Sequence, residues 1–442
     1  MRKNMIKTSV GMRLIIIAAL TLVLLIPAVM IQTLIHERQQ RRDSAIQEVS
    51  DKWGNTQTLS GPILSVPFKV HSKTDKGELI TTVKYAHFLP EDLNISGSIR
   101  PEIRYRGIYE VVLYNATLKL AGSFSFPDFR DLNIPGKDIL WKDSFAAIGI
   151  TDMKGIKDFI TVRWNSHELP AHPGIESNDV LASGIRVKTP LSPEIGKFEF
   201  SADINLNGST GLMFTPIGKE TKIEVSSDWA NPSFTGYFLP ESREVTADGF
   251  TAKWKVLHLN RNYPQAWLGS KHQIEASAFG VKLLLAVDEY QKTMRTAKYA
   301  VMFISLTFLS FFMIELLNRK VLHPIQYLLI GFALLVFYTL LLSFSEHIVF
   351  KYAYLIASAG ILSLITAYTK SVLSSTLQTA IIGGILILLY GYLYIVLQLQ
   401  DYALLMGSLG LFVVLATIMY LTRRIDWFSV MKHGGGAEKA PK

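Results

Sequence analysis

The last third of the chain is almost continuous apolar sequence, cut into helix-length segments by short polar breaks. A hydrocarbon core of about 30 Å takes about 20 residues of helix to cross. Backbone groups inside a bilayer must be satisfied internally, and these runs lack the alternation of barrel strands. With one more apolar segment near the N-terminus, the sequence predicts a polytopic α-helical membrane protein with six transmembrane helices, at residues 14–35, 299–317, 325–344, 352–368, 377–397 and 402–421.

The first apolar segment, residues 14–35, has the character of either a signal peptide or a permanent anchor. Its apolar run is longer than the roughly 7–15 residues of a signal peptide, and no small-x-small cleavage site follows it. We therefore expect an uncleaved signal anchor that can kink at Pro27. The charged residues 36–52 are helical in character and are expected to continue this helix as a stalk.

Lysine and arginine lie mainly on one side of the predicted spans, and this bias sets the orientation of a membrane protein. The N-terminal tail (1–13) holds four of them, the break after the second span holds Arg319 and Lys320, and the C-terminal tail (422–442) holds five. The alternate short breaks hold only Lys351. We expect both tails in the cytoplasm (N-in/C-in) and residues 36–298 on the outer side.

The net charge of +9 follows from this topology rather than from a nucleic-acid partner. Residues 37–298 hold 32 Lys+Arg and 31 Asp+Glu, a balance of +1, whereas the remainder holds 13 and 5, a balance of +8. The chain has no cysteine, which excludes thiol chemistry and a disulfide framework for the outer segment.

The outer segment, residues 36–298, is inserted between the first and second spans and is predicted to be a large β-rich domain of the sandwich type. Apolar and polar residues alternate over 198–206 and again over 250–256, a pattern typical of half-buried antiparallel strands. Shorter runs near 118–126 and 281–287 also favour strands. Residues 168–193 are rich in Pro, Gly, Ser and Asn and are expected to form a long loop.

Sequence motifs for catalysis or for metal and cofactor binding are absent. No histidines have the H-x-x-x-H or H-E-x-x-H spacing that places two ligands on one helix face. The chain also lacks a G-x-S-x-G nucleophile elbow, a Walker A motif and a G-x-G-x-x-G turn after a strand. We therefore predict no catalytic residues, no cofactor, no metal and no enzymatic activity.

Ionisable residues within membrane spans are functional candidates by default. Glu315 lies near the cytoplasmic end of the second predicted span, where a structural role is the simpler interpretation: its side chain reaches the interface or pairs with Arg319 at i+4. Glu346 and His347 follow the third span at the outer interface. These three residues are the candidate functional residues of the membrane part.

Several segments resemble the CreD family of bacterial inner-membrane proteins. The most specific is the block Leu-His-Pro-x-Gln-Tyr-Leu at 322–328. The resemblance covers nearly the whole chain in order and is weakest from about 130 to 195. The other matching segments lie at 61–67, 228–234, 238–245, 295–300, 306–308, 337–338, 345–347 and 421–428.

Members of that family are described as cell-envelope integrity proteins of Gram-negative bacteria, associated with the CreBC two-component system. The resemblance implies an inner-membrane location, a periplasmic domain and a link to envelope stress or the β-lactam response. It supplies no reaction, and no catalytic residues can be carried over.

Four kinds of function remain open from the sequence. The leading hypothesis is a non-enzymatic envelope protein whose β domain binds a periplasmic or envelope protein partner while the helices anchor it in the lipid bilayer. The main alternative is a transporter or lipid-handling protein that uses the five C-terminal spans. An envelope hydrolase or a sensor would need an outer pocket that sequence patterns do not reveal.

Overall fold

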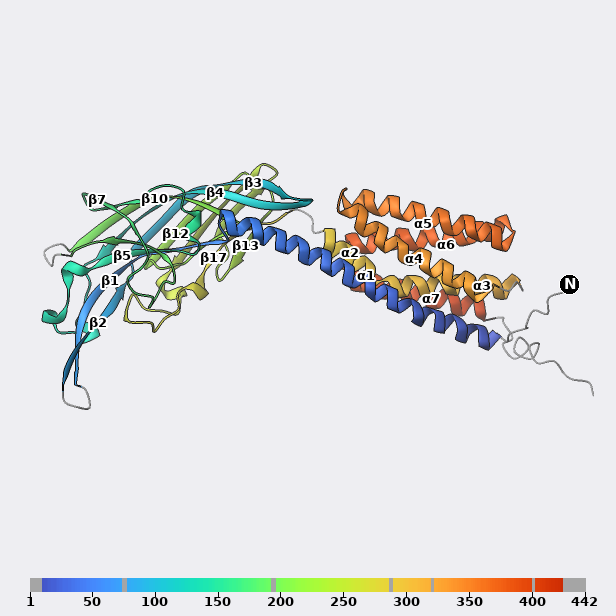
Figure 1. The fold of residues 1–442 in the computed structure, drawn as a ribbon, viewed down its shortest axis with the longest axis horizontal. Helices are drawn as coiled ribbons and strands as arrows, with labels where there is room; N and C mark the ends of the chain where they lie inside the picture. The colour runs from blue at the N-terminus through green and yellow to red at the C-terminus, as the bar shows by residue number, and fades with distance from the viewer. Residues whose placement is uncertain are drawn as a thin grey trace, which may run out of the picture. The chain divides into compact units, whose positions relative to one another are not determined.

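The computed structural model describes residues 10–73, 78–191, 196–285, 289–318, 322–399 and 402–423. The chain divides into two compact units, a helical unit (1–41 and 287–442) and a β unit (42–286). Figure 1 shows the helices of the first unit and the strands of the second. The boundary falls inside one continuous helix, so the same helix belongs to both units.

Seven α-helices are described. The first has 44 residues and continues without interruption through Pro27 to the end of the expected stalk. The kink considered at Pro27 does not break the helix. The helices are α1 (Val10–Trp53), α2 (Glu289–Lys298), α3 (Ala300–Asn318), α4 (Pro324–Ser345), α5 (Phe350–Leu373), α6 (Thr376–Gln398) and α7 (Ala403–Thr422).

Four of the described helices, α1, α4, α5 and α6, are long and apolar enough to cross a membrane. A fifth candidate is the pair α2 and α3, which is bent by 44° at Tyr299. In α7 the apolar run of Leu405–Tyr420 is a shorter helix. The chain is thus a multi-pass membrane protein, and the number of six spans and the N-in/C-in orientation stay predictions.

The apolar part of α1 packs against the other helices through one narrow stripe. Leu24, Ala28, Ile31 and Ile35 are buried, at spacings of four, three and four residues. This spacing places the four side chains on one helix face, as in helix–helix seams. Gly331 of α4 makes room for Leu24, because a Cβ added there would lie 2.2 Å from the Leu24 Cδ1 atom.

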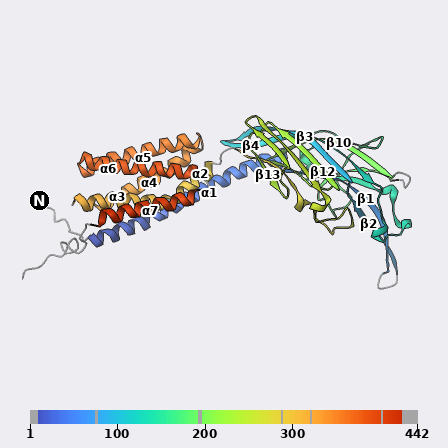
Figure 2. The same ribbon diagram turned by 180° about the vertical axis from the view of Figure 1, so that it is seen from behind.

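The β unit contains two sheets, whose strands are visible from both sides in Figures 1 and 2. In the first sheet the order is β13-β17-β11-β1-β5-β9-β8, with β2 added to β1 and β16 to β2. All its pairings are antiparallel except that between β1 and β11. The strands are β1 (Gln57–Lys73), β2 (Leu79–Phe88), β5 (Phe145–Ile150), β8 (His172–Pro173), β9 (Gly184–Lys188), β11 (Gly211–Phe214), β13 (Pro232–Gly236), β16 (Ala266–Leu268) and β17 (Phe279–Leu283).

The second sheet has eight strands in the order β14-β15-β12-β3-β4-β10-β6-β7. Its long central strands are antiparallel, whereas β12 runs parallel to β3. The predicted alternating runs 198–206 and 250–256 lie in β10 and β15, so both strand predictions are confirmed. The strands are β3 (Asp92–Arg106), β4 (Tyr109–Ser125), β6 (Thr161–Trp164), β7 (His167–Pro170), β10 (Lys197–Ser209), β12 (Glu220–Ser227), β14 (Ser242–Thr246) and β15 (Gly249–Leu257).

Both sheets contribute to a single hydrophobic core. It joins Leu64 and Ile148 of the first sheet with Leu118 and Ile204 of the second. The prediction of a large β-rich domain with half-buried strands is therefore confirmed. Outward residues of β10 and of positions 94–100 of β3 are polar, so this part of the sheet face presents hydroxyl, amide and charged groups.

Residues 168–193 are not one long loop, contrary to the prediction. They contain β7, β8 and the strand β9, whose residues Ile185 and Val187 are buried in the core. The strand is short and surrounded by turn-forming residues, so its local pattern is weak. Its pairing with the distant β5 decides its structure.

Candidate functional site

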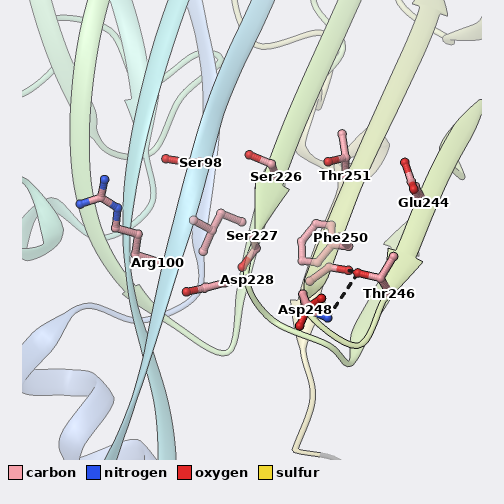
Figure 3. A pocket seen from close by; sticks show the side chains of 12 residues that line it. Ser98, Arg100, Ser226, Ser227, Asp228, Glu244, Thr246, Asp248, Phe250 and Thr251 are labelled. Carbon is pink, nitrogen blue, oxygen red and sulfur yellow. Dashed lines mark hydrogen bonds between the residues drawn. The ribbon is translucent and has the colours of Figure 1, made fainter.

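A polar groove of about 510 Å³ lies on the open face of the second sheet, across β3, β12, β15 and β14 (Figure 3). This volume is within the range of ligand sites. Five hydroxyl side chains, three carboxylates and one guanidinium line it. The lining residues are Ser98, Ile99, Arg100, Ser226, Ser227, Asp228, Glu244, Thr246, Asp248, Gly249, Phe250 and Thr251.

Strand register aligns four of these side chains in one row across the sheet. Glu244 pairs with Thr251, Thr251 with Ser226, and Ser226 with Ser98. Figure 3 shows them following one another from Ser98 to Glu244 over neighbouring strands. Beyond the groove the row continues from Ser98 to Thr117 of β4. We refer to Ser98, Ser226 and Thr251 as the hydroxyl row.

The next row of side chains on the same face contains charged residues that pair with each other. Lys253 and Glu224 face each other and form an ion pair of 2.9 Å, and Glu224 is opposite Ser96. The hydroxyl row thus runs beside a charged row, although none of its own three residues is ionisable. Hydrogen-bonding groups are therefore available along the hydroxyl row without fixed charge.

The three carboxylates of the groove, Asp228, Glu244 and Asp248, do not form a metal site. Across the described ranges, no group of three or more His, Cys, Asp or Glu side chains is arranged to hold a metal ion. All three carboxylates are exposed to solvent. Exposed carboxylates can accept hydrogen bonds from the donors of a ligand.

Glu315 is buried among three helices of the helical unit. The Arg13 Nη1 atom of α1 donates to Glu315 Oε1 at 2.8 Å, and the Tyr327 hydroxyl of α4 donates to Glu315 Oε2 at 3.0 Å. Only 3% of Glu315 is exposed. Arg319, the expected partner, lies outside the described residues, so the cluster is defined by Arg13 and Tyr327.

Glu346 occupies a similar position near the other end of the α1 span. It accepts a hydrogen bond of 2.9 Å from the Tyr290 hydroxyl and lies 3.8 Å from Arg38 of α1. His347 is exposed, and within the described residues no hydrogen bond joins its side chain to this cluster. Arg13 and Arg38 are 25 positions apart, or about 37 Å of helix at 1.5 Å per residue.

A buried Ser–His–Asp arrangement in the β unit was not predicted from the sequence. Ser65 Oγ lies 2.9 Å from His87 Nδ1, and His87 Nε2 lies 3.3 Å from Asp179 Oδ2. Burial lowers the pKa of His87, although the Asp179 carboxylate opposes that shift. Ser65 is only 3% exposed, so its hydroxyl is not accessible to a substrate. The arrangement fits a satisfied core histidine better than a nucleophilic site.

The sequence contained partial signals for these sites. Asp228 and Glu244 lie in two segments that carry the family resemblance, but their convergence on one groove depends on strand order. From the sequence, Arg13 was interpreted only as one of the charges that set the membrane orientation, because its partner Glu315 lies 302 positions later. Among the three candidate residues, Glu315 and Glu346 each bind another helix, in separate clusters.

Together these features define a class of protein, a multi-pass membrane protein with a large two-sheet β domain. A family model described as "Inner membrane protein CreD" matches residues 9–428. The chain is also 32% identical over 434 residues to the inner membrane protein CreD of Escherichia coli (strain K12), covering 96% of this chain and 95% of that protein. The chain belongs to the CreD family of inner membrane proteins, as its sequence segments predicted.

Proposed function

We propose that this inner-membrane protein supports the integrity of the cell envelope without catalysing a reaction, by binding an envelope partner through a β domain that lies in the periplasm. The polar groove on the second sheet is the observation that carries the proposal, since it is a concave site with convergent polar groups. The bias of lysine and arginine toward the tails supports the periplasmic placement.

The contacts of the membrane carboxylates favour this function over transport. Glu315 and Glu346 each bind side chains of neighbouring helices. A residue that binds a transported ion or proton must exchange partners during the cycle. Buried carboxylates held by an arginine and a tyrosine are better suited to fixing the packing of α1.

The experiment is complementation of a deletion strain with the full chain, with leakage of a periplasmic marker enzyme as the readout. The groove variant combines Asp228→Asn, Glu244→Gln and Asp248→Asn, which keep side-chain size but remove charge. We expect this variant to be inserted at normal levels and to leak nearly as much as the deletion strain. The conservative Glu315→Gln variant, which retains a partner for Tyr327, should largely restore integrity.

The matched control is Glu224→Gln, an exposed carboxylate of the same sheet face outside the groove. It should restore integrity fully. If the groove variant also complements fully while Glu315→Gln fails at normal abundance, the helical unit is the active part and the proposal is wrong.

A further inference from the structure

We propose that the groove and the hydroxyl row bind an uncharged polysaccharide chain that lies across the strands of the second sheet. This inference deepens the proposed function, on which it rests, by assigning the envelope partner to the class of glycans. It depends on three observations about the open sheet face: the row of hydroxyls, the mixture of hydrogen-bond donors and acceptors that line the groove, and the distribution of charge.

The hydroxyl row offers regularly spaced hydrogen-bonding groups. Neighbouring strands lie about 4.8 Å apart, so the path from Ser98 through Ser226 and Thr251 to Glu244 covers three steps, or roughly 14 Å. A linear ligand lying along this path would meet a new side chain on each strand. The row continues at Thr117, which is exposed, so the path remains open beyond the groove.

The chemical groups along the path match a ligand rich in hydroxyls. Serine and threonine hydroxyls both donate and accept, whereas carboxylates only accept and a guanidinium only donates. Sugar hydroxyls can satisfy all three kinds, because each donates one hydrogen bond and accepts others. Arg100 can bind the carbonyl oxygen of an acetamido group at one side of the groove, while Glu244 and Asp248 accept from hydroxyls at the other side.

Charge complementarity argues against other extended polymers. A nucleic acid or acidic polymer needs clustered cations, but the groove has three carboxylates and a single guanidinium, Arg100. A basic peptide needs carboxylates along its length, whereas the path from Ser98 to Glu244 has a carboxylate at one end and hydroxyls at its other three positions. The uncharged row between β3 and β15 therefore fits an uncharged chain best.

The test is binding of oligosaccharides to the full chain in lipid nanodiscs, measured by isothermal titration calorimetry. The probes are the hexamer of N-acetylglucosamine and cellohexaose, which differ in their acetamido groups. We expect saturable binding of at least one hexamer. The combined variant Ser98→Ala, Ser226→Ala and Thr251→Val should weaken it about tenfold or more, because three hydrogen bonds are lost.

Ser96→Ala is the matched control, since it removes the same hydroxyl from the same strand two residues away, in the charged row. Its affinity should remain within about twofold of the wild type. Near-ultraviolet circular dichroism of all variants would show that the sheet is intact. These substitutions are on an open face, so the fold should persist.

Two results would overturn the inference. One is no detectable binding of either hexamer at millimolar concentration; the other is equal binding by the wild type and the row variant. Octalysine tests a basic peptide as the alternative ligand. If the wild type binds octalysine and the variant with Asp228, Glu244 and Asp248 replaced does not, the groove is a basic peptide site instead. If the groove variant fails in complementation but neither hexamer binds to the wild type, the proposed function survives and only the ligand class is wrong.

Discussion

Arg13 and Glu315 form an ion pair of 2.8 Å that joins the first helix of the chain to α3, 302 positions later. A helix that served only as a targeting signal would not need such a partner. Together with the Arg38–Glu346 contact, this pair fixes α1 to the helical unit near both ends of its apolar run. The first span is therefore part of the packed bundle.

Removing the cation of this pair should destabilise the helical unit. Among the described residues, Arg13→Ala leaves the buried Glu315 carboxylate with Tyr327 as its side-chain partner, and breaking a buried pair costs several kcal/mol. Because about a quarter of the Arg13 side chain is exposed, we expect a loss of about 2 kcal/mol. Thermal unfolding in detergent would measure it. Arg41→Ala, an exposed position of the same helix, should change the Tm little.

Gly331 should tolerate no larger residue while Leu24 is present. Gly331→Ala places a Cβ 2.2 Å from Leu24 Cδ1, and overpacking of this kind costs about 1–3 kcal/mol. The double variant with Leu24→Ala should recover part of that loss, as measured by unfolding in detergent. Gly384→Ala in α6, where an added Cβ meets nothing within 4 Å, is the control. Equal losses in the single and double variants would contradict the Leu24 contact.

His87 should make the stability of the β unit depend on pH. Burial lowers the pKa of His87 below the ordinary histidine value of 6.5, so the unfolded chain binds a proton more readily than the folded chain. Stability should therefore rise with pH through the window just below 6.5 and level off above it. His87→Gln should flatten this part of the profile. Thermal melts between pH 5 and 8, compared for the two proteins, would detect the difference; parallel profiles would exclude the effect.

Tyr114→Phe should lower the free energy of unfolding of the β unit by about 1–2 kcal/mol, the usual cost of losing a buried hydrogen bond. The Tyr114 hydroxyl donates to the Gly211 carbonyl oxygen at 2.8 Å, and the side chain is only 1% exposed. Urea unfolding of the full chain, followed by tryptophan fluorescence, would measure the change. Tyr105→Phe, at an exposed tyrosine on β3, should be nearly neutral.

Local patterns were enough to predict the long elements of the fold. The apolar helices α1, α4, α5 and α6 are long enough to cross a membrane, and the strict alternation of apolar and polar residues in β10 is typical of a strand. They were not enough for the bend at Tyr299, nor for β9, which depends on pairing with the distant strand β5. The predicted second span is thus preceded by a separate helix, α2.

The candidate sites show the same division between local and distant information. Glu315 was found because a carboxylate in an apolar run is rare. Its partner Arg13 could not be found, since a charge beside the first span is equally well explained by topology. The hydroxyl row could not be predicted from the sequence for another reason. It requires the strand order β14-β15-β12-β3, which includes a parallel pairing of strands far apart in the chain.

Two contacts of α1 within the helical unit share one angular register. Arg13 binds Glu315 and Leu24 packs beside Gly331, both on one unbroken helix. The two residues are 11 positions apart, close to three turns of about 3.6 residues, so both face the same side of α1. One residue inserted between them would rotate Arg13 by about 100° relative to the packed face, so the phase of this segment is constrained as well as its length.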